Sequence, residues 1–504
     1  MRILLVYPEF PETFWSFRHA LKFVSKRASY PPLGLITVAA MLPEEWDKRL
    51  VDMNVSPLSA RDLAWADYVF LSAMVVQRSS AGEVIARCNR LGVPVVAGGP
   101  LFTEEPEKFP TADHLVLNEA EATLPAFLRD LAAGRPQRIY SSPEFPDLTH
   151  TPPPLWELLD LRRYMDMCIQ YSRGCPFNCE FCNITSLFGH QPRTKTATQV
   201  IAELNKLYGL GWRGSVFFVD DNLIGNKRRF REELLPALLA WKARDRGITF
   251  QTEASINLAD DEELTAAMVQ AGFDSVFVGI ETPADESLAE CRKVQNQGRD
   301  LVGSVRRLQR AGLQVQGGFI VGFDSDTPSI FQRQVEFIQK SAIVVAMVGI
   351  LQAPRGSALH ARMQREGRLL RDCTGDNTDG VINFEPRMDR GLLQEGYRRL
   401  VREVYAPRAY YQRVRTFLSS LGPAAFDPPV RRRLSVAEVR AFLRSIYHIG
   451  IRGVERWHYW RLFAWALRRP RLFPLAIRFT IYGYHCRRHA ERLSTGPAPQ
   501  PSSA

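Results

Sequence analysis

The sequence has no apolar run that could cross a bilayer, since no uncharged apolar stretch reaches the ~18 residues that a spanning helix needs. Its N-terminus, MRILLVYPEF, lacks the basic region, long apolar core and cleavage site of a signal peptide. The eight cysteines in 504 residues are ordinary usage, and those outside Cys175–Cys182 show no pairing pattern. This usage argues against a secreted disulfide framework and predicts a protein of the reducing cytoplasm.

Acidic residues are scarce in the C-terminal tail. From Arg431 onward there are fifteen arginines, no lysine and three acids, a net charge of +12, while the rest has 50 bases and 51 acids. Residues 457–486 also mix Trp, Tyr, Phe and Leu with arginines, a pattern that suits the membrane interface. We therefore predict peripheral contact with the inner face of the membrane, with an ordinary solvated helical surface as the alternative. Nucleic acid is not expected, because no recognition motif accompanies the charge.

Short apolar runs alternate with helical patterns in the first part of the chain. This alternation predicts a doubly wound, Rossmann-like α/β domain over residues 1–140, whose ligands bind beyond the carboxyl ends of the strands. A proline-rich linker over 141–160 follows it. The expected strands are 3–7, 49–53, 68–72, 93–97 and 115–117, with helices at 33–42, 81–91 and 121–133.

A second alternating series predicts a partial (β/α)6 barrel over residues 161–365, with its active site at the carboxyl ends of the strands. Beyond it we expect a helical extension at 366–430, a basic aromatic helical tail at 431–492 and disorder at 493–504. The expected barrel strands are 169–172, 215–219, 249–253, 275–280, 314–321 and 345–351, with helices such as 197–207, 261–271 and 300–311.

Three cysteines crowd onto one predicted loop, directly after the first barrel strand. Cys175, Cys179 and Cys182 have the spacing C-x3-C-x2-C, and soft thiolates suit iron–sulfur ligation. Three thiolates hold three irons of a [4Fe–4S] cluster and leave the fourth iron to chelate S-adenosylmethionine (SAM). A structural zinc site is the alternative, but zinc usually takes four ligands and the one further candidate nearby is His190.

The triad, with Phe181 before its third cysteine, resembles the radical SAM superfamily, which cleaves SAM reductively to a 5′-deoxyadenosyl radical. The resemblance implies that Phe181 packs on the adenine and that Asp220 and Asp221 lie where the amino group of SAM binds. It also implies that Glu281 contacts the ribose and that small residues let the backbone approach SAM closely. The implied SAM-binding residues are Phe181, Asp220, Asp221, Glu253, Ser255, Glu281 and Gly318, with Asn257 on the same segment.

The doubly wound domain before this barrel resembles the cobalamin-binding branch of the superfamily. The strings that carry the resemblance are PPLGL, LSAMVVQR and AGGP. A D-x-H-x-x-G motif, which supplies a histidine to cobalt elsewhere, is absent, so we expect cobalamin to bind base-off and without a histidine ligand. The family's G-E-G-E string stands here as Asn118-Glu119-Ala120-Glu121. The implied cobalamin contacts are Pro32, Leu33, Ser72, Gly98, Gly99 and Pro100.

The strings FVDDNLIGN, GIETP and GFIVGFDSDTP are similar to a subgroup that contains hopanoid C-2 methylases. This resemblance implies radical methylation of an unactivated carbon in a hydrophobic, lipid- or terpenoid-like small molecule. The implied cofactors are the [4Fe–4S] cluster, SAM and cobalamin, with an external electron donor of the flavodoxin or ferredoxin type. One alternative is a cobalamin-dependent radical SAM oxidoreductase or cyclase that does not methylate. Another is a membrane- or nucleic-acid-binding protein with a structural metal centre.

Overall fold

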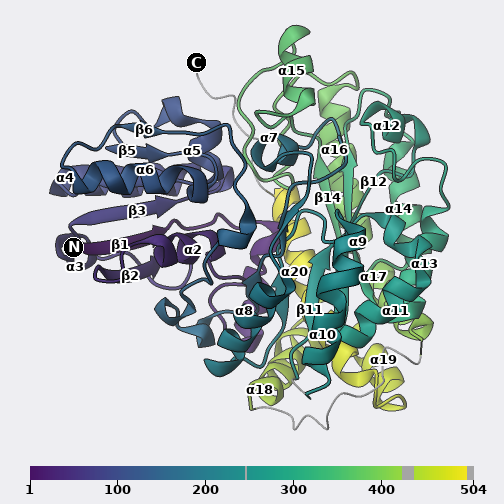
Figure 1. Cartoon of the computed structure of the whole chain (residues 1–504). Coiled ribbons are helices and arrows are strands. Elements are labelled where there is room, and N and C mark those ends of the chain that lie inside the picture. Colours follow the sequence, from purple (N-terminus) through teal and green to yellow (C-terminus); the bar gives the residue numbers. More distant parts are fainter. Residues whose placement is uncertain (245–246, 423–435, 496–504) are drawn as a thin grey trace. The chain divides into compact units, whose positions relative to one another are not determined.

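The structure is a computed structural model that describes residues 1–244, 247–422 and 436–495 (Figure 1). The backbone divides into two compact units. Unit 1 comprises Met1–Glu12, Arg27–Pro176 and Asn183–Asp221. Unit 2 comprises Thr13–Lys26, Phe177–Cys182 and Asn222–Ala504.

The first sheet of unit 1 has six parallel strands in the order β2-β1-β3-β4-β5-β6. The strand order reverses beside β1, which is the doubly wound arrangement that the sequence predicts. The edge strand β6 was not predicted, because a strand of two residues leaves no recognisable pattern. The strands are β1 (Arg2–Tyr7), β2 (Asp47–Asp52), β3 (Tyr68–Ser72), β4 (Val95–Gly98), β5 (His114–Val116) and β6 (Ile139–Tyr140).

Helices pack on both faces of this sheet (Figure 1). Successive side chains of a strand point to opposite faces, so Leu4 and Val6 belong to one buried core and Ile3 and Leu5 to the other. The first core includes residues of α3, α4 and α5, and the second includes residues of α2 and α6. The helices are α2 (Leu33–Met41), α3 (Ala60–Trp65), α4 (Arg78–Leu91), α5 (Pro100–Glu104) and α6 (Ala120–Ala132).

Unit 1 also contains the start of the second α/β series. Strand β7 (Met167–Ile169) pairs in parallel with β10 (Val216–Phe218). Between them, β8 (Ser172–Arg173) and β9 (Arg193–Thr194) form an antiparallel pair. Helix α8 (Ala197–Gly209) then leads into β10, and the short α7 (Ile184–Phe188) follows the cysteine loop.

Unit 2 continues the series with four parallel strands in the order β14-β13-β12-β11. Helices connect them, and Figure 1 shows α11 to α14 along one side of the strands. The strands are β11 (Phe250–Glu253), β12 (Phe273–Glu281), β13 (Gln314–Val321) and β14 (Ala346–Ile350). The helices are α9 (Lys227–Arg229), α10 (Leu235–Lys242), α11 (Glu262–Ala271), α12 (Asp285–Glu290), α13 (Leu301–Ala311) and α14 (Ile330–Ser341).

The C-terminal part of unit 2 is helical, as predicted. Helix α1 (Arg18–Val24), which the sequence places in the first domain, packs in unit 2 against α18 and α20. The end of α20 includes residues 493–495, where disorder was predicted; residues 431–435 and 496–504 lie outside the described residues. The helices are α15 (Ala358–Arg365), α16 (Arg390–Val404), α17 (Pro407–Ser420), α18 (Val436–Ser445), α19 (Arg456–Leu467) and α20 (Phe473–Thr495).

Among the residues that the structure describes, no helix combines the length and the apolar character needed to cross a membrane.

A buried histidine on α20 should make unit 2 acid-sensitive. His489 is 2% exposed, and neither ring nitrogen has a hydrogen-bond partner among the described residues. Burial, reinforced by Arg492, lowers its pKa from 6.5 to about 3. As the pH falls, His489 is therefore protonated in the unfolded chain before it is protonated in the folded one. The stability that the neutral histidine contributes is present above pH 6.5 and is lost as the pH falls toward 3.

We expect His489 alone to lower the free energy of unfolding by about 2 kcal/mol between pH 7 and pH 5. Urea denaturation at pH 7, 6 and 5 measures this, with His489→Phe as the variant that removes the titrating group. The variant should have a correspondingly flatter pH dependence. Equal pH slopes for the variant and the wild type would show that the histidine is not kept neutral by burial.

Candidate functional site

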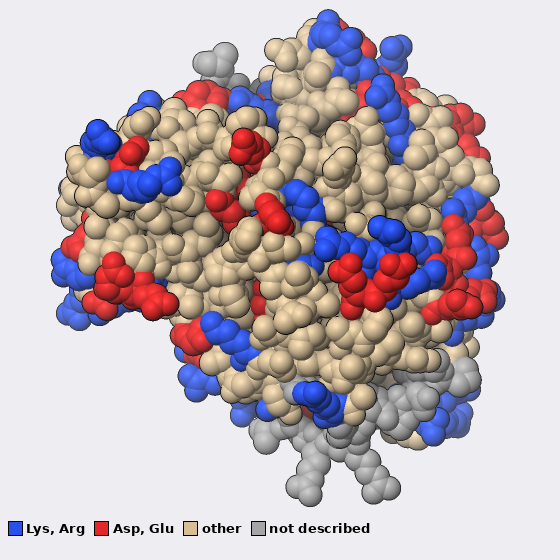
Figure 2. Space-filling model, in the orientation of Figure 1, with Lys and Arg blue, Asp and Glu red and all other residues tan. Residues whose placement is uncertain are grey.

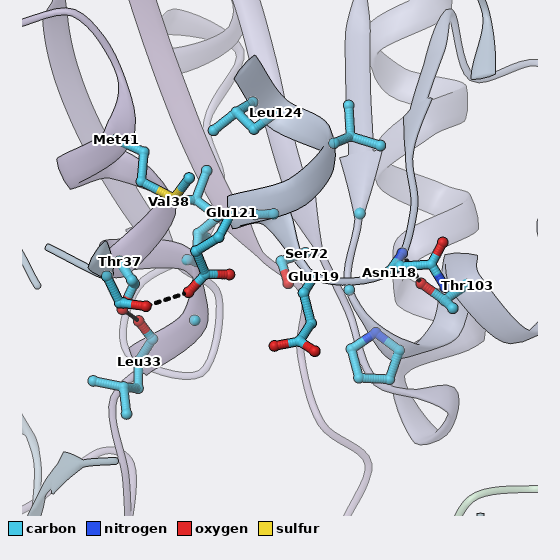
Figure 3. Close-up of a pocket in the computed structure, with 18 of the residues that line it drawn as sticks. Leu33, Thr37, Val38, Met41, Ser72, Thr103, Asn118, Glu119, Glu121 and Leu124 are labelled. Carbon is cyan, nitrogen blue, oxygen red and sulfur yellow. Dashed lines mark hydrogen bonds between the residues drawn. The ribbon is translucent and has the colours of Figure 1, made fainter. Parts of the chain in front are cut away.

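A pocket of about 290 Å³ lies at the carboxyl edge of the first sheet of unit 1. One wall comes from α2, where Gly34, Thr37, Val38 and Met41 recur at helical spacing. Figure 3 shows Thr37, Val38 and Met41 on one side of the pocket and Ser72, Thr103 and Asn118 on another. Five of the predicted cobalamin-binding residues line it, namely Leu33, Ser72, Gly98, Gly99 and Pro100. Pro32 is the residue directly before α2.

The backbone conformation of the turn after β4 requires a glycine. Gly99 has a φ of +90°, a conformation that side chains disfavour, and a Cβ there would lie 2.7 Å from Ser72 Oγ. The turn leads directly into α5, which begins at Pro100. The AGGP string therefore shapes the pocket wall through its backbone and leaves space for a ligand.

Two carboxylates of the Asn118–Glu121 string face the same pocket (Figure 3). Glu119 accepts from Arg173 Nη1 at 2.6 Å and from Arg193 Nη2 at 2.6 Å. Glu121 accepts from Arg173 Nη2 at 2.8 Å and from Thr151 Oγ1 at 2.8 Å. Despite burial, Arg173 lowers the pKa of Glu121. The string that departs from the family pattern thus forms a buried ion-pair network with the residue two positions before Cys175.

Arg173 lies directly before the cysteine loop, and two carboxylates that follow β10 bind the backbone at the start of this loop. Gly174 donates its backbone N–H to Asp221 Oδ2 at 3.3 Å, and its φ of +95° places a hypothetical Cβ 2.8 Å from the carbonyl of Gly189. Asp220 accepts from Ser172 Oγ at 2.6 Å and from the backbone N–H of Tyr171 at 3.2 Å. Burial raises the pKa of Asp220 to about 7 and that of Asp221 to about 6. Both predicted carboxylates therefore support the start of the cysteine loop.

The three cysteines of this loop differ from the other five in exposure. Cys175, Cys179 and Cys182 are half-buried, whereas the remaining five are buried. The backbone turns tightly, because Cys182 N–H donates to the carbonyl of Cys179 at 3.1 Å. Within residues 1–244, 247–422 and 436–495, no three His, Cys, Asp or Glu side chains meet the geometry of a ready-made metal site. Partial exposure and a shared loop therefore distinguish these three thiols from the other five as candidate ligands of a metal cluster.

Within unit 2, a lysine that the sequence did not predict lies beside the second part of the loop. Lys293 Nζ is 2.7 Å from Glu281 Oε1 and 5.9 Å from the centroid of the Phe181 ring. Although burial lowers it, the charges of Glu281 and of Cys179 raise the pKa of Lys293 above its ordinary value. Gln295 Nε2 lies 4.0 Å from Cys179 Sγ. Phe181, Glu281 and Cys179 thus meet around one cation.

Glu281 is held in a strained conformation at the end of β12. Its φ of +63° is in the left-handed region, and the pairing of β12 with β13 shifts register between Gly279 and Glu281. Asn296 Nδ2 donates to the carbonyls of Gly279 and Ile280, both at 3.0 Å. Strain of this kind costs ~1–3 kcal/mol and concentrates at functional sites, where the surrounding structure holds it.

The chain between Cys179 and Cys182 is anchored by the helical extension. Glu180 accepts from Arg362 Nε at 2.7 Å, and its carbonyl accepts from Leu359 N–H of α15 at 2.8 Å. Arg362 also bonds Asp324 Oδ2 at 2.7 Å, in the loop after β13. Residues 177 to 182 are therefore braced by an ion-pair cluster from two elements.

The other predicted SAM-binding residues lie at strand ends in unit 2. Ser255 Oγ donates to Asn257 Oδ1 at 2.6 Å and accepts from Asn222 Nδ2 at 3.2 Å. The carbonyl of Glu253 accepts from Leu223 N–H at 3.0 Å. At Gly318 on β13, a Cβ would lie 2.8 Å from the ring of Phe277, so the glycine permits close packing there.

Three sequence profiles match the chain in succession. The B12 binding domain matches residues 24–128, and the Radical SAM superfamily matches residues 169–338. A domain of unknown function (DUF4070) matches residues 357–497. Two of these profiles correspond to the two cofactor domains that the sequence predicts.

Full-length relatives carry methyltransferase names. An uncharacterized methyltransferase of Synechocystis sp. is 41% identical over 500 residues, which is 97% of this chain and 92% of the relative. The hopanoid C-2 methylase of Rhodopseudomonas palustris is 36% identical over 479 residues, 93% of this chain and 89% of the relative.

Solved structures show the same fold. The methyltransferase TsrM from Kitasatospora setae, with cobalamin and a [4Fe–4S] cluster bound, has a TM-score of 0.60 at 13% identity and covers 98% of this chain and 100% of its own. OxsB with aqua-cobalamin and SAM bound has a TM-score of 0.61 at 13% identity, covering 99% and 82%. From the domain profiles and the identity to full-length relatives, we conclude that the chain belongs to the cobalamin-dependent radical SAM methyltransferase family, an enzyme family that uses a [4Fe–4S] cluster, SAM and cobalamin.

Proposed function

We propose that the protein methylates an unactivated carbon of a polycyclic, hopanoid-like lipid. The observation that carries the proposal is the 36% identity to the hopanoid C-2 methylase, which extends over 93% of this chain and includes the C-terminal helical region. Family membership leaves the structural-metal alternative without support. A small hydrophobic molecule is therefore the substrate class, and an external flavodoxin- or ferredoxin-type protein is the electron donor that the chemistry requires.

In this proposal, Cys175, Cys179 and Cys182 hold the cluster. Their partial exposure and their braced loop fit a cluster that must reach SAM and an electron donor. The residues proposed to bind SAM are Phe181, Asp220, Asp221, Glu253, Ser255, Glu281 and Gly318. Lys293, which pairs with Glu281, supplies positive charge beside a thiolate-rich loop and so offsets its negative charge.

The pocket of unit 1 is proposed to take part of cobalamin. Its volume of about 290 Å³ is just below the ~300–1,000 Å³ of small-molecule pockets, so it suits an extension of the cofactor such as the nucleotide tail. Pro32, Leu33, Ser72, Gly98, Gly99 and Pro100 are the proposed contacts.

When bound, the cluster supplies the electron that cleaves SAM, and cobalamin carries the methyl group to the substrate. The contribution of the chain is positioning. The Glu119–Arg173–Glu121 network joins the pocket wall to the backbone two residues before Cys175, within unit 1. This network holds the backbone at Arg173 against the pocket wall. We place the reaction in the cytoplasm, peripherally at the membrane.

The proposed reaction is tested by its products. Protein reconstituted anaerobically with iron, sulfide and cobalamin is given a reductant, SAM and a hopanoid. Methylation should release S-adenosylhomocysteine and 5′-deoxyadenosine in equal amounts and give a product heavier by one methylene unit. Formation of 5′-deoxyadenosine without S-adenosylhomocysteine would instead support the non-methylating oxidoreductase or cyclase.

A further inference from the structure

The DUF4070 region presents two helices that are apolar on two sides. Towards the interior, Ala441, Ile449, Tyr459 and Leu462 are buried at 7% exposure or less. These residues lie on α18, the π-helix Ile446–Ile451 and α19, which pack against α1, α17 and α20. One apolar stripe would suffice to attach these helices to unit 2.

A second apolar stripe faces outward, and we call it the α18–α19 face. Val439, Leu443, Tyr447 and Ile451 follow one another at every fourth residue and are 44%, 58%, 47% and 58% exposed. Val454 and Trp457 are each 71% exposed, and Trp460 and Leu467 continue the stripe along α19. Of the seventeen large apolar side chains that stand exposed in the described residues, these are eight. Such a concentration marks an interaction surface.

Arginines surround this face with little acidic charge to balance them. Arg440, Arg452, Arg456 and Arg461 are exposed. Glu455 is buried and paired with Arg487 at 3.1 Å, which leaves Glu438 as the one exposed acid among the described residues of α18 and α19. Elsewhere on the surface shown in Figure 2, acidic and basic side chains lie intermingled.

Aromatic rings and arginines are also in direct contact here. The Arg452 guanidinium lies 5.4 Å from the centroid of the Tyr447 ring, and that of Arg456 lies 6.0 Å from Trp457. Paired aromatic and basic side chains are typical of the boundary between headgroups and acyl chains, where a ring is half in lipid and a cation meets phosphate.

We propose that the α18–α19 face docks on the surface of a bilayer that contains anionic lipid. A second copy of this chain fits less well, because a symmetric contact would bring the same arginines against each other. An anionic surface pairs with the arginines and accepts the apolar side chains together. The inference deepens the proposed peripheral location and assigns a role to the DUF4070 region. It does not depend on which lipid carbon is methylated.

Vesicle binding tests the proposal on the full chain. At low salt, the protein should co-sediment with vesicles of phosphatidylcholine and phosphatidylglycerol and much less with phosphatidylcholine alone. The double variant Ile451→Ser/Trp457→Ser should bind more than about tenfold more weakly, because two exposed apolar groups are lost. Arg452→Gln/Arg456→Gln should reduce the preference for the anionic vesicles.

A matched control uses two leucines of unit 1, Leu91 and Leu210, which are 53% and 40% exposed. The variant Leu91→Ser/Leu210→Ser should bind vesicles like the wild type. Unchanged binding by the Ile451→Ser/Trp457→Ser variant would overturn the proposal, and so would a change in its oligomeric state without any vesicle effect. SAM cleavage measured without lipid should be equal in all variants, so a vesicle result is independent of the methylation result.

Discussion

Replacement of Cys179 by alanine should abolish reductive cleavage of SAM, with more than about a hundredfold loss of 5′-deoxyadenosine formation. The thiol is proposed to be one of three that hold the cluster, and even residues that merely support metal ligands cost ~10–100-fold when replaced. The side chain is half-buried, so its loss leaves no large cavity. Reconstituted wild-type protein should hold about four irons per chain, and the variant should fall well below that.

A buried cysteine provides the matched control. Cys88 on α4 is 0% exposed and belongs to a core of the first sheet, away from the loop. The Cys88→Ala variant should keep full iron content and SAM cleavage, with a modest loss of thermal stability from the missing packing. If Cys179→Ala retained iron and cleavage at the wild-type level, the assignment of the triad would be wrong.

The alternation of strands and helices was predictable because each parallel strand is buried on both faces and each helix on one. Eleven expected strands correspond to strands of the structure within a few residues, and β13 matches its predicted range of 314–321. The segment Thr13–Lys26 was assigned to the first domain because neighbours in sequence usually pack together. Its Phe14 and Phe17 instead pack in unit 2 near His485 of α20, more than 450 positions later. Local patterns carry no trace of such a contact.

Parts of the candidate site could be predicted where all of their residues lie within one short sequence motif. The cysteine triad and the AGGP turn are of this kind, because spacing or backbone conformation alone requires those residues. Arg362 and Arg173 were missed because each acts through partners distant in sequence, and Lys293 because its partner Glu281 lies on a different element, the strand β12. A lone lysine or arginine in a helical or loop pattern is indistinguishable from a solvated one until the fold buries it. The Asn118–Glu121 string could have signalled the network, since two acids in a buried turn require cations.

Filling the pocket of unit 1 should separate cobalamin binding from folding. Gly34 lies on the pocket-lining side of α2, and a Cβ there would meet no heavy atom within 4 Å. Gly34→Phe can therefore be accommodated by the free protein while its ring occupies space that the cofactor needs. A steric conflict of that kind with the cofactor costs ~1–3 kcal/mol, which corresponds to about 5–150-fold weaker binding of cobalamin.

Gly34→Ala is the matched control, because it adds the same Cβ without the ring. Gly34 is the second residue of α2, where alanine is tolerated at least as well as glycine, so this variant should fold and bind cobalamin as the wild type does. Binding is measured by titration of the absorbance of hydroxocobalamin, and folding by circular dichroism. Because the cysteine loop is untouched, Gly34→Phe should retain its iron and still cleave SAM while S-adenosylhomocysteine formation falls. If Gly34→Phe bound cobalamin with the affinity of the wild type, the cofactor would not enter this pocket. If the variant lost both iron and cobalamin, the substitution would also disturb the ion pair between Glu119 and Arg173.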